Sequence, residues 1–235
     1  MVVLVAALLL AALTARLGVW QMDRAGEKRQ LYEAQVGQRA LPTLAEAELA
    51  RSPAQAAAQR HRLVALQGHW LPAHTVYLEN RLMQGRTGFY AVTPLQLADG
   101  SVVLVQRGWL ARDPGDRSRI TVPAPPGGLV QVMGRVAPAL GRLYEFDAAP
   151  TGLIRQNLDI AGFARETALP LRPVAVVQED GDKPPQDGLQ RQWPLPSADL
   201  QKHHGYAFQW FALSALTITL YVWFQLIRPR RRRAA

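Results

Sequence analysis

Apolar residues are distributed along this chain in two ways, as long continuous runs near both ends and as short alternating runs between them. The run near the C-terminus, Tyr206–Ile227, has 22 residues and no charged side chain. As a helix it would be about 33 Å long, which is enough to cross a hydrocarbon core of about 30 Å. Aromatic side chains gather at both of its ends, as they do at membrane interfaces. A helix in a soluble core seldom stays uncharged for this length, so the pattern predicts a transmembrane helix over residues 203–227.

The N-terminal run, Val2–Ala15, is apolar throughout and extends to Trp20 with Arg16 as its only charged interruption. A cleaved signal peptide is the alternative interpretation. However, no Lys or Arg precedes the run, and residues 13–15 match a cleavage site only in part. We therefore predict a retained transmembrane helix over residues 1–20, whose arginine reaches toward the interface. A natural start a few residues upstream would lengthen this helix.

Five arginines follow the second predicted span, at position 228 and at positions 230–233. Such a cluster beside a span indicates the cytoplasmic side of a membrane. With a span at each end, both termini are expected in the cytoplasm and the central residues outside it. The five arginines supply more than half of the net charge of +9, since 9 − 5 leaves +4. We therefore attribute the basic character to topology and to contact with membrane lipid, and we expect no nucleic-acid partner.

The central part of the chain has the short alternating pattern of β-strands. Asp99-Gly100 separates two apolar runs and is a strong hairpin signal. Strands are predicted over residues 62–70, 74–80, 88–97, 101–110, 129–137 and 172–178. These residues can bury a single core. The pattern therefore predicts one β-rich domain, as a small barrel or a curled antiparallel sheet.

Taken together, the pattern predicts an α+β membrane protein with two transmembrane helices that flank one β-rich extracytoplasmic domain. Its helical connector should be interrupted at Pro53, and Asn157 should cap a short helix over 158–167. The predicted parts are the N-terminal span 1–20, the helical connector 21–61, the β-rich domain 62–202, the C-terminal span 203–227 with its histidine pair, and the basic cytoplasmic tail 228–235.

The candidate chemistry is limited by what the chain lacks. It has no cysteine, which excludes disulfides and thiolate metal sites. It also has no nucleophile-elbow, zinc-protease or phosphate-loop motif, so a membrane-anchored hydrolase is disfavoured and we do not expect an enzyme. The histidines are His61, His69, His74, His203 and His204. The last two stand where the second span meets the interface, and a neutral imidazole there could ligate a haem iron. A polar pair that simply ends the span is the plainer alternative.

Four segments, in the same order and spread along nearly the whole chain, resemble one protein family. They are LGVWQMDRAGEK (17–28), GRTGFYAVTPLQLADGSVVLVQRGWLAR (85–112), LIRQNLDIAGFA (153–164) and HHGYAFQWFALSA (203–215). They are similar to the Gly-x-Trp-Gln-x-x-Arg signature, the central Arg-Gly-Trp hairpin and the His-x-x-Tyr-Ala-x-x-Trp-Phe segment of the surfeit locus protein one family. Members of that family are cytochrome c oxidase assembly factors.

The resemblance implies an assembly factor in the bacterial inner membrane. Its expected role is to help insert haem a into the haem-bearing subunit of a haem–copper oxidase, so its expected partners are that subunit and the haem a synthase. The family histidine matches His203, which becomes the candidate ligand of the haem iron. Trp20, Arg24 and Arg107 match further family positions, and the two arginines are the candidates to face a haem propionate.

The chain departs from the family pattern at two positions. Gln106 stands where the family usually has Asn, and His204 stands where an apolar residue is common. The second departure makes His204 an alternative ligand. Two other functions stay open beside haem handling: a scaffold that binds oxidase subunits without a cofactor, and a β-rich sensor or transport accessory.

Overall fold

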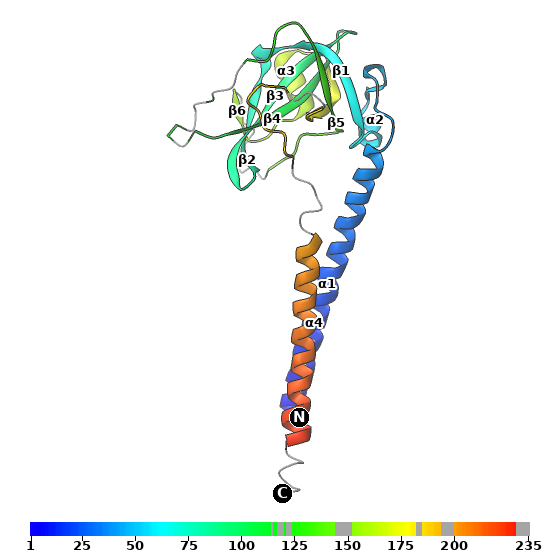
Figure 1. Ribbon diagram of the computed structural model, residues 1–235, viewed down its shortest axis with the longest axis vertical. Coiled ribbons are helices and arrows are strands. Elements are labelled where there is room, and N and C mark those ends of the chain that lie inside the picture. The colour runs from blue at the N-terminus through cyan, green and yellow to red at the C-terminus, as the bar shows by residue number, and fades with distance from the viewer. Residues whose placement is uncertain are drawn as a thin grey trace. The chain divides into compact units, whose positions relative to one another are not determined.

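The computed structural model describes residues 1–113, 115–116, 120, 124–143, 152–181, 185–193 and 200–228. Its contacts divide the chain into two compact units. One consists of Met1–Ala34 together with Leu195–Ala235, and the other of Gln35–Pro194. Figure 1 shows the helices of the first unit and the strands of the second. The arginines at 230–233, on which the predicted orientation depends, lie outside the described residues.

The first unit is built from two long helices, most of α1 (Val2–Arg39) and α4 (Leu200–Val222), while the last five residues of α1 belong to the second unit. Helix α4 continues as a π-helical stretch, η4 (Trp223–Ile227). Both predicted spans are confirmed as helices that are long and apolar enough to cross a membrane. Large apolar side chains such as Leu9, Phe208 and Leu216 are exposed on them, as expected for helices that face lipid.

The two helices pack along a narrow seam. The seam residues of α1 recur at steps of three and four, and so do those of α4, which is the spacing of helices that cross at a small angle. On α1 they are Ala11, Thr14, Gly18, Gln21 and Ala25, and on α4 they are His203, Ala207, Trp210, Ser214, Thr217 and Tyr221. The pairs Ala11–Ser214 and Gln21–His203 show that the helices run antiparallel. Small residues in the seam permit a local contact, in which the Ser214 hydroxyl reaches the backbone carbonyl of Ala11.

The second unit is a closed β-structure. Its strands are β1 (Leu63–Trp70), β2 (Val76–Met83), β3 (Arg86–Leu97), β4 (Val102–Ala111), β5 (Leu129–Ala137), β6 (Ile154–Arg155) and β7 (Leu171–Gln178). Their order is β1-β5-β7-β4-β3-β2-β6, and an additional pairing of β1 with β3 closes five of them into a ring. The predicted small barrel is thus confirmed. The parallel pairs are β2–β6 and β4–β7, so the sheet is mixed rather than antiparallel throughout.

Closure of the ring depends on a close backbone approach between β1 and β3. Gly68 pairs with Leu97, and a Cβ atom at Gly68 would lie only 2.2 Å from the carbonyl oxygen of Gln96. Only glycine fits such a contact without moving the backbone. The main core inside the ring is aliphatic and includes the fully buried Val64, Leu95 and Val105.

The connector before β1 has the interruption that Pro53 predicts. A single 3-10 turn, η1 (Glu46–Glu48), is followed by the short helix α2 (Pro53–Ala58), whose first residue is that proline. The Ser52 hydroxyl accepts a hydrogen bond from the Gln55 N–H and caps α2. A further 3-10 turn, η2 (Pro72–His74), joins β1 to β2.

One helix begins two residues later than expected. In α3 (Ile160–Thr167) the N-cap is Asp159, whose carboxylate accepts a 2.7 Å hydrogen bond from the Gly162 N–H. The prediction of Asn157 as the cap is therefore wrong. Asn157 instead bonds the backbone N–H and carbonyl of Leu143, because its amide can donate and accept at once.

Candidate functional site

The candidate site on the helical unit is centred on His203, near the start of α4. Its Nδ1 atom lies 2.7 Å from the side-chain oxygen of Gln21 on α1, and the contact is partly buried. An amide oxygen only accepts hydrogen bonds, so Nδ1 carries the proton in this pair. The other ring nitrogen, Nε2, then keeps its lone pair. This is the arrangement in which a histidine is oriented by one nitrogen and can ligate a metal through the other.

The other candidates of this unit flank the pair without joining it. His204 is exposed and points away from the seam, since adjacent residues of a helix lie about 100° apart. Trp20 precedes Gln21 and is 51% exposed. The Arg24 guanidinium bonds the Glu27 carboxylate at 2.7 Å, and both side chains are more than half exposed. An exposed pair of this kind holds its partners weakly, so Arg24 is accessible to another anion.

Two contacts further along the seam hold the helices in the register that brings Gln21 to His203. The Ser214 hydroxyl donates a 2.9 Å hydrogen bond to the backbone carbonyl of Ala11, and this contact is buried. Gly18 packs against the ring of Phe211, where a Cβ atom would lie 2.7 Å from a ring carbon. Sequence reasoning missed the part played by Gln21. Its position after Trp20 in the Gly-x-Trp-Gln motif was the signal that could have revealed it.

Arg107 belongs to the other unit, on β4, where it is 2% exposed. Its guanidinium donates a 3.0 Å hydrogen bond to the Asp187 carboxylate and lies 5.2 Å from the centre of the Trp70 ring. Burial lowers the pKa of this guanidinium, and the Asp187 charge opposes that shift. Arg107 also lines a cavity of about 250 Å³ beside Tyr77. The role of Arg107 toward a propionate stays a prediction, beside the carboxylate that it already holds.

The residues present fit a haem cargo in three respects. Nε2 of His203 provides a neutral nitrogen donor, the exposed apolar faces of both helices suit a long apolar tail, and Arg24 offers a cation. Among the described residues, no group of three or more His, Asp or Glu side chains could form a separate metal site.

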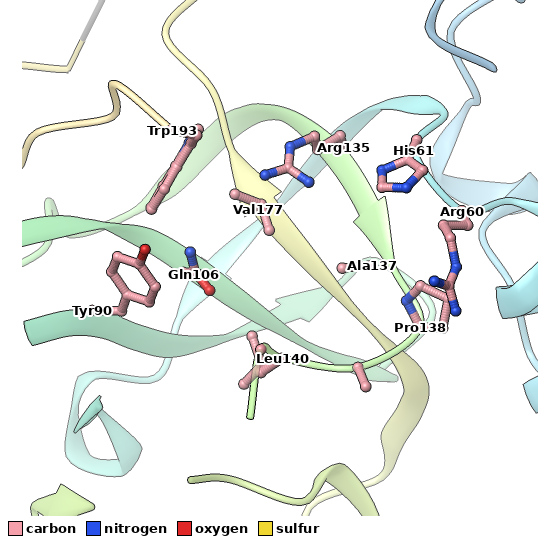
Figure 2. A pocket seen from close by; sticks show the side chains of 12 residues that line it. Arg60, His61, Tyr90, Gln106, Arg135, Ala137, Pro138, Leu140, Val177 and Trp193 are labelled. Atoms are coloured by element: carbon pink, nitrogen blue, oxygen red, sulfur yellow. The ribbon is translucent and has the colours of Figure 1, made fainter. Parts of the chain in front are cut away.

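A second recess, which the sequence did not reveal, lies in the β unit. It measures about 340 Å³ and is lined by Arg60, His61, Tyr90, Gln106, Arg135 and Trp193 with apolar neighbours. Figure 2 shows these side chains converging on it from separate strands and loops. Gln106 is one of the two positions at which the chain departs from the pattern of the family that it resembles.

Comparison with known proteins connects both units to a single family. A sequence model of the SURF1 family matches residues 8–215. A SURF1-like protein of Rickettsia felis is 28% identical over 218 residues, which cover 88% of this chain and 89% of the relative. A SURF1-like protein of Rickettsia bellii is 27% identical over 216 residues, covering 87% of this chain and 83% of the relative. A shorter match, 39% identical over 59 residues, is to a SURF1-like protein of Dictyostelium discoideum and covers 25% of this chain and 22% of the relative.

Proposed function

The chain belongs to the SURF1 family, and from this premise we propose that it is an assembly factor for a haem–copper (cytochrome c) oxidase. In this role it holds haem a as a cargo and assists its insertion into the haem-bearing oxidase subunit. It acts as a carrier and not as a catalyst. The observation that carries the proposal is the contact between His203 and Gln21 in the seam of the two candidate spans.

The chemistry of the helical unit supports this role residue by residue. His203 offers Nε2 to the haem iron while Gln21 holds the ring in one orientation. Haem a has a long apolar tail, which the lipid-facing sides of α1 and α4 accommodate, and propionates, for which Arg24 is the accessible cation. A haem iron that is held by one histidine is also easier to release than one that is held by two residues.

The two candidate spans indicate a membrane protein. We place it in a bacterial inner membrane, with both termini in the cytoplasm and the β unit on the periplasmic side. That placement puts His203 near the outer interface, because α4 begins there and ends at the arginine cluster. The haem a synthase and the haem-bearing subunit are the partners that this site would meet.

The test is haem a content. The full chain is expressed with the haem a synthesis enzymes, purified in detergent, and examined by optical spectroscopy and pyridine haemochrome analysis. We expect haem a near one per chain in the unchanged protein and in His204→Ala, and loss of most of it in His203→Ala. His69→Ala, which changes an exposed histidine of the β unit, is the matched control.

Two outcomes would overturn the proposal. Haem a at the level of a mock purification would favour the cofactor-free scaffold. Full haem a in His203→Ala, in His204→Ala and in the double variant would place the cargo elsewhere.

A further inference from the structure

The recess of the β unit is lined in part by basic side chains. Arg60, His61 and Arg135 contribute these side chains, and no Asp or Glu is among the described residues that line the recess. Figure 2 shows Arg60 and His61 at one end of the recess, Tyr90, Gln106 and Trp193 at the other, and Arg135 between them. Its volume of about 340 Å³ falls within the range of small-ligand sites.

The charges around the recess do not cancel. Glu179 bonds both Arg39, at 2.7 Å, and the Nε atom of Arg135, at 3.1 Å. One carboxylate thus serves two guanidinium groups. Within the described part of the chain, the two terminal nitrogens of Arg135 have no hydrogen-bond partner, and the exposed Arg60 side chain has no ion pair. Among the described groups, the recess therefore carries an excess of positive charge with unused donors.

His61 responds to this excess charge. Burial is the main cause that lowers the pKa of its imidazole, and the charges of Arg135, Arg60 and Arg39 lower it further. Its Nδ1 atom is buried without a hydrogen-bond partner among the described residues. The backbone at His61 has φ of 69°, a left-handed conformation that is uncommon outside glycine. The lowered pKa favours the neutral ring, which donates through one nitrogen only, and protonation beside a bound anion would add a second donor.

The other end of the recess combines an apolar surface with one buried amide. The rings of Tyr90 and Trp193 meet edge to face at 5.3 Å, and Leu140 adds an aliphatic surface. Gln106 is 6% exposed, yet its side-chain amide makes no hydrogen bond to a described residue. Gln106 lines the recess, so its amide can donate a hydrogen bond to a ligand bound there.

We propose that this recess binds an oxyanion, a carboxylate or a phosphate, borne on a flat or apolar body. The oxyanion contacts the basic side chains of Arg60, His61 and Arg135, and receives a hydrogen bond from Gln106. The body of the ligand lies against Trp193, Tyr90 and Leu140. Such a group is carried by a free small molecule or by the C-terminus of a polypeptide that ends in an apolar residue. This site is separate from the proposed haem site and does not rest on it.

Calorimetric titration of the detergent-purified full chain tests the proposal. The probes are benzoate, phenyl phosphate, the uncharged benzamide, and a short peptide ending in phenylalanine with a free or an amidated C-terminus. We expect saturable binding of at least one anionic probe and none of the uncharged forms. Binding only of the small anions assigns a free small molecule as the source, and binding of the free-carboxylate peptide assigns a polypeptide C-terminus.

Two variants locate the binding. Arg60→Gln changes an exposed side chain and should weaken the anion about fivefold. Gln106→Leu keeps the volume, removes the amide and should weaken it about tenfold. Arg165→Gln, which removes an exposed arginine on α3 outside the recess, should change nothing. Unchanged affinity in both Arg60→Gln and Gln106→Leu, benzamide binding as tightly as benzoate, or no saturable binding of any anion would each overturn the proposal.

A second readout follows His61 by NMR. The groups around it are Arg39, Arg60, Arg135 and Tyr90, with Glu179 shared between two of the arginines. Bound anion should raise the pKa of His61, and the probe should bind more tightly as the pH falls through that pKa. An unchanged pKa at saturating probe would also contradict the site.

Discussion

The imidazole of His203 and the side-chain amide of Gln21 lie in contact, with Nδ1 and the amide oxygen 2.7 Å apart, although 182 positions separate them in the chain. Each residue stands on the inner side of its own helix. The contact therefore links the two segments of the chain that match the family pattern nearest its ends. Its consequence is that the contact favours the His203 tautomer with the proton on Nδ1.

Replacing Gln21 should reduce cargo binding without removing the ligand. In Gln21→Leu the acceptor at Nδ1 is lost, so both tautomers of His203 become populated and the ring turns more freely. We expect haem a affinity to fall about tenfold to 100-fold. Haem content of the full chain measures the effect, and ¹⁵N NMR of His203 without haem measures the tautomer. Gln30→Leu, an exposed position further along α1, is the control.

The two readouts separate two kinds of failure. A shift of the tautomer with unchanged haem content would mean that haem binding does not depend on the tautomer that Gln21 favours. An unchanged tautomer would contradict the role of Gln21 itself.

The seam can be tested by crosslinking, because the chain has no natural cysteine. Ala11→Cys with Ser214→Cys places two thiols where the structure has a 2.9 Å contact between the same residues, and oxidation should join them. Adding Gly18→Val should lower the yield, since its side chain would collide with the Phe211 ring. Phe211→Ala should then restore it. Equal yields in all three backgrounds would show that Gly18 and Phe211 do not set the helix spacing.

Asp99 should make the stability of the β unit depend on pH. The pKa of this carboxyl lies well below its usual range. The causes are, in order of size, hydrogen bonds from the Ser101 hydroxyl, from Arg51 and from the Ser101 N–H, followed by the charge of Arg172. A lowered folded-state pKa stabilises the fold above the unfolded-state pKa of about 3.9, and this contribution is lost as the pH falls toward the folded-state value. Asp99→Asn should lower the free energy of unfolding by about 1 kcal/mol at pH 7. The effect is small because the carboxylate is partly exposed to solvent.

Thermal unfolding of the full chain in detergent, followed by tryptophan fluorescence, measures this difference. The difference in stability between Asp99→Asn and the unchanged protein should decrease steadily as the pH is lowered from 5 to 2. A difference that stays constant over that interval would rule out the ionised carboxylate as its cause.

Arg107 should contribute strongly to the stability of the β unit. Arg107→Gln leaves the buried Asp187 with Arg191 as its remaining described charge partner and Trp70 without the cation over its ring. Removing one member of a buried ion pair typically lowers the free energy of unfolding by about 3 kcal/mol. Haem a per folded chain, determined on the same sample, tests the separate prediction that Arg107 faces a propionate. A stability change below about 0.5 kcal/mol would contradict the structural role.

The sequence pattern predicted where the helices and strands lie in the chain better than it predicted which of them pack or pair with one another. Uncharged runs and period-two alternation indicate which residues are buried away from water. These patterns located both spans and six of the strands. They do not report which strand lies beside which, so the β1–β3 closure at Gly68 and the two-residue strand β6 could not be foreseen. The cap of α3 was misplaced for a similar reason, since Asn157 and Asp159 are both good caps and tertiary contacts decide between them.

The candidate site shows the same limit. His203 was identified through a motif, but its contact with Gln21 depends on how two distant helices are registered, which neither motif contains. The recess was missed entirely because its donors come from separate parts of the chain and each one alone resembles an ordinary surface residue.

The order of the elements in the chain has a consequence for biogenesis. The ring cannot close before β7 is available, because β7 lies between β5 and β4. The helix that supplies His203 is made later still, after residue 200. During synthesis the barrel strands are therefore complete before Gln21 can meet His203. A chain that stalls or is truncated before α4 can therefore have a finished barrel but lacks His203, the proposed haem ligand.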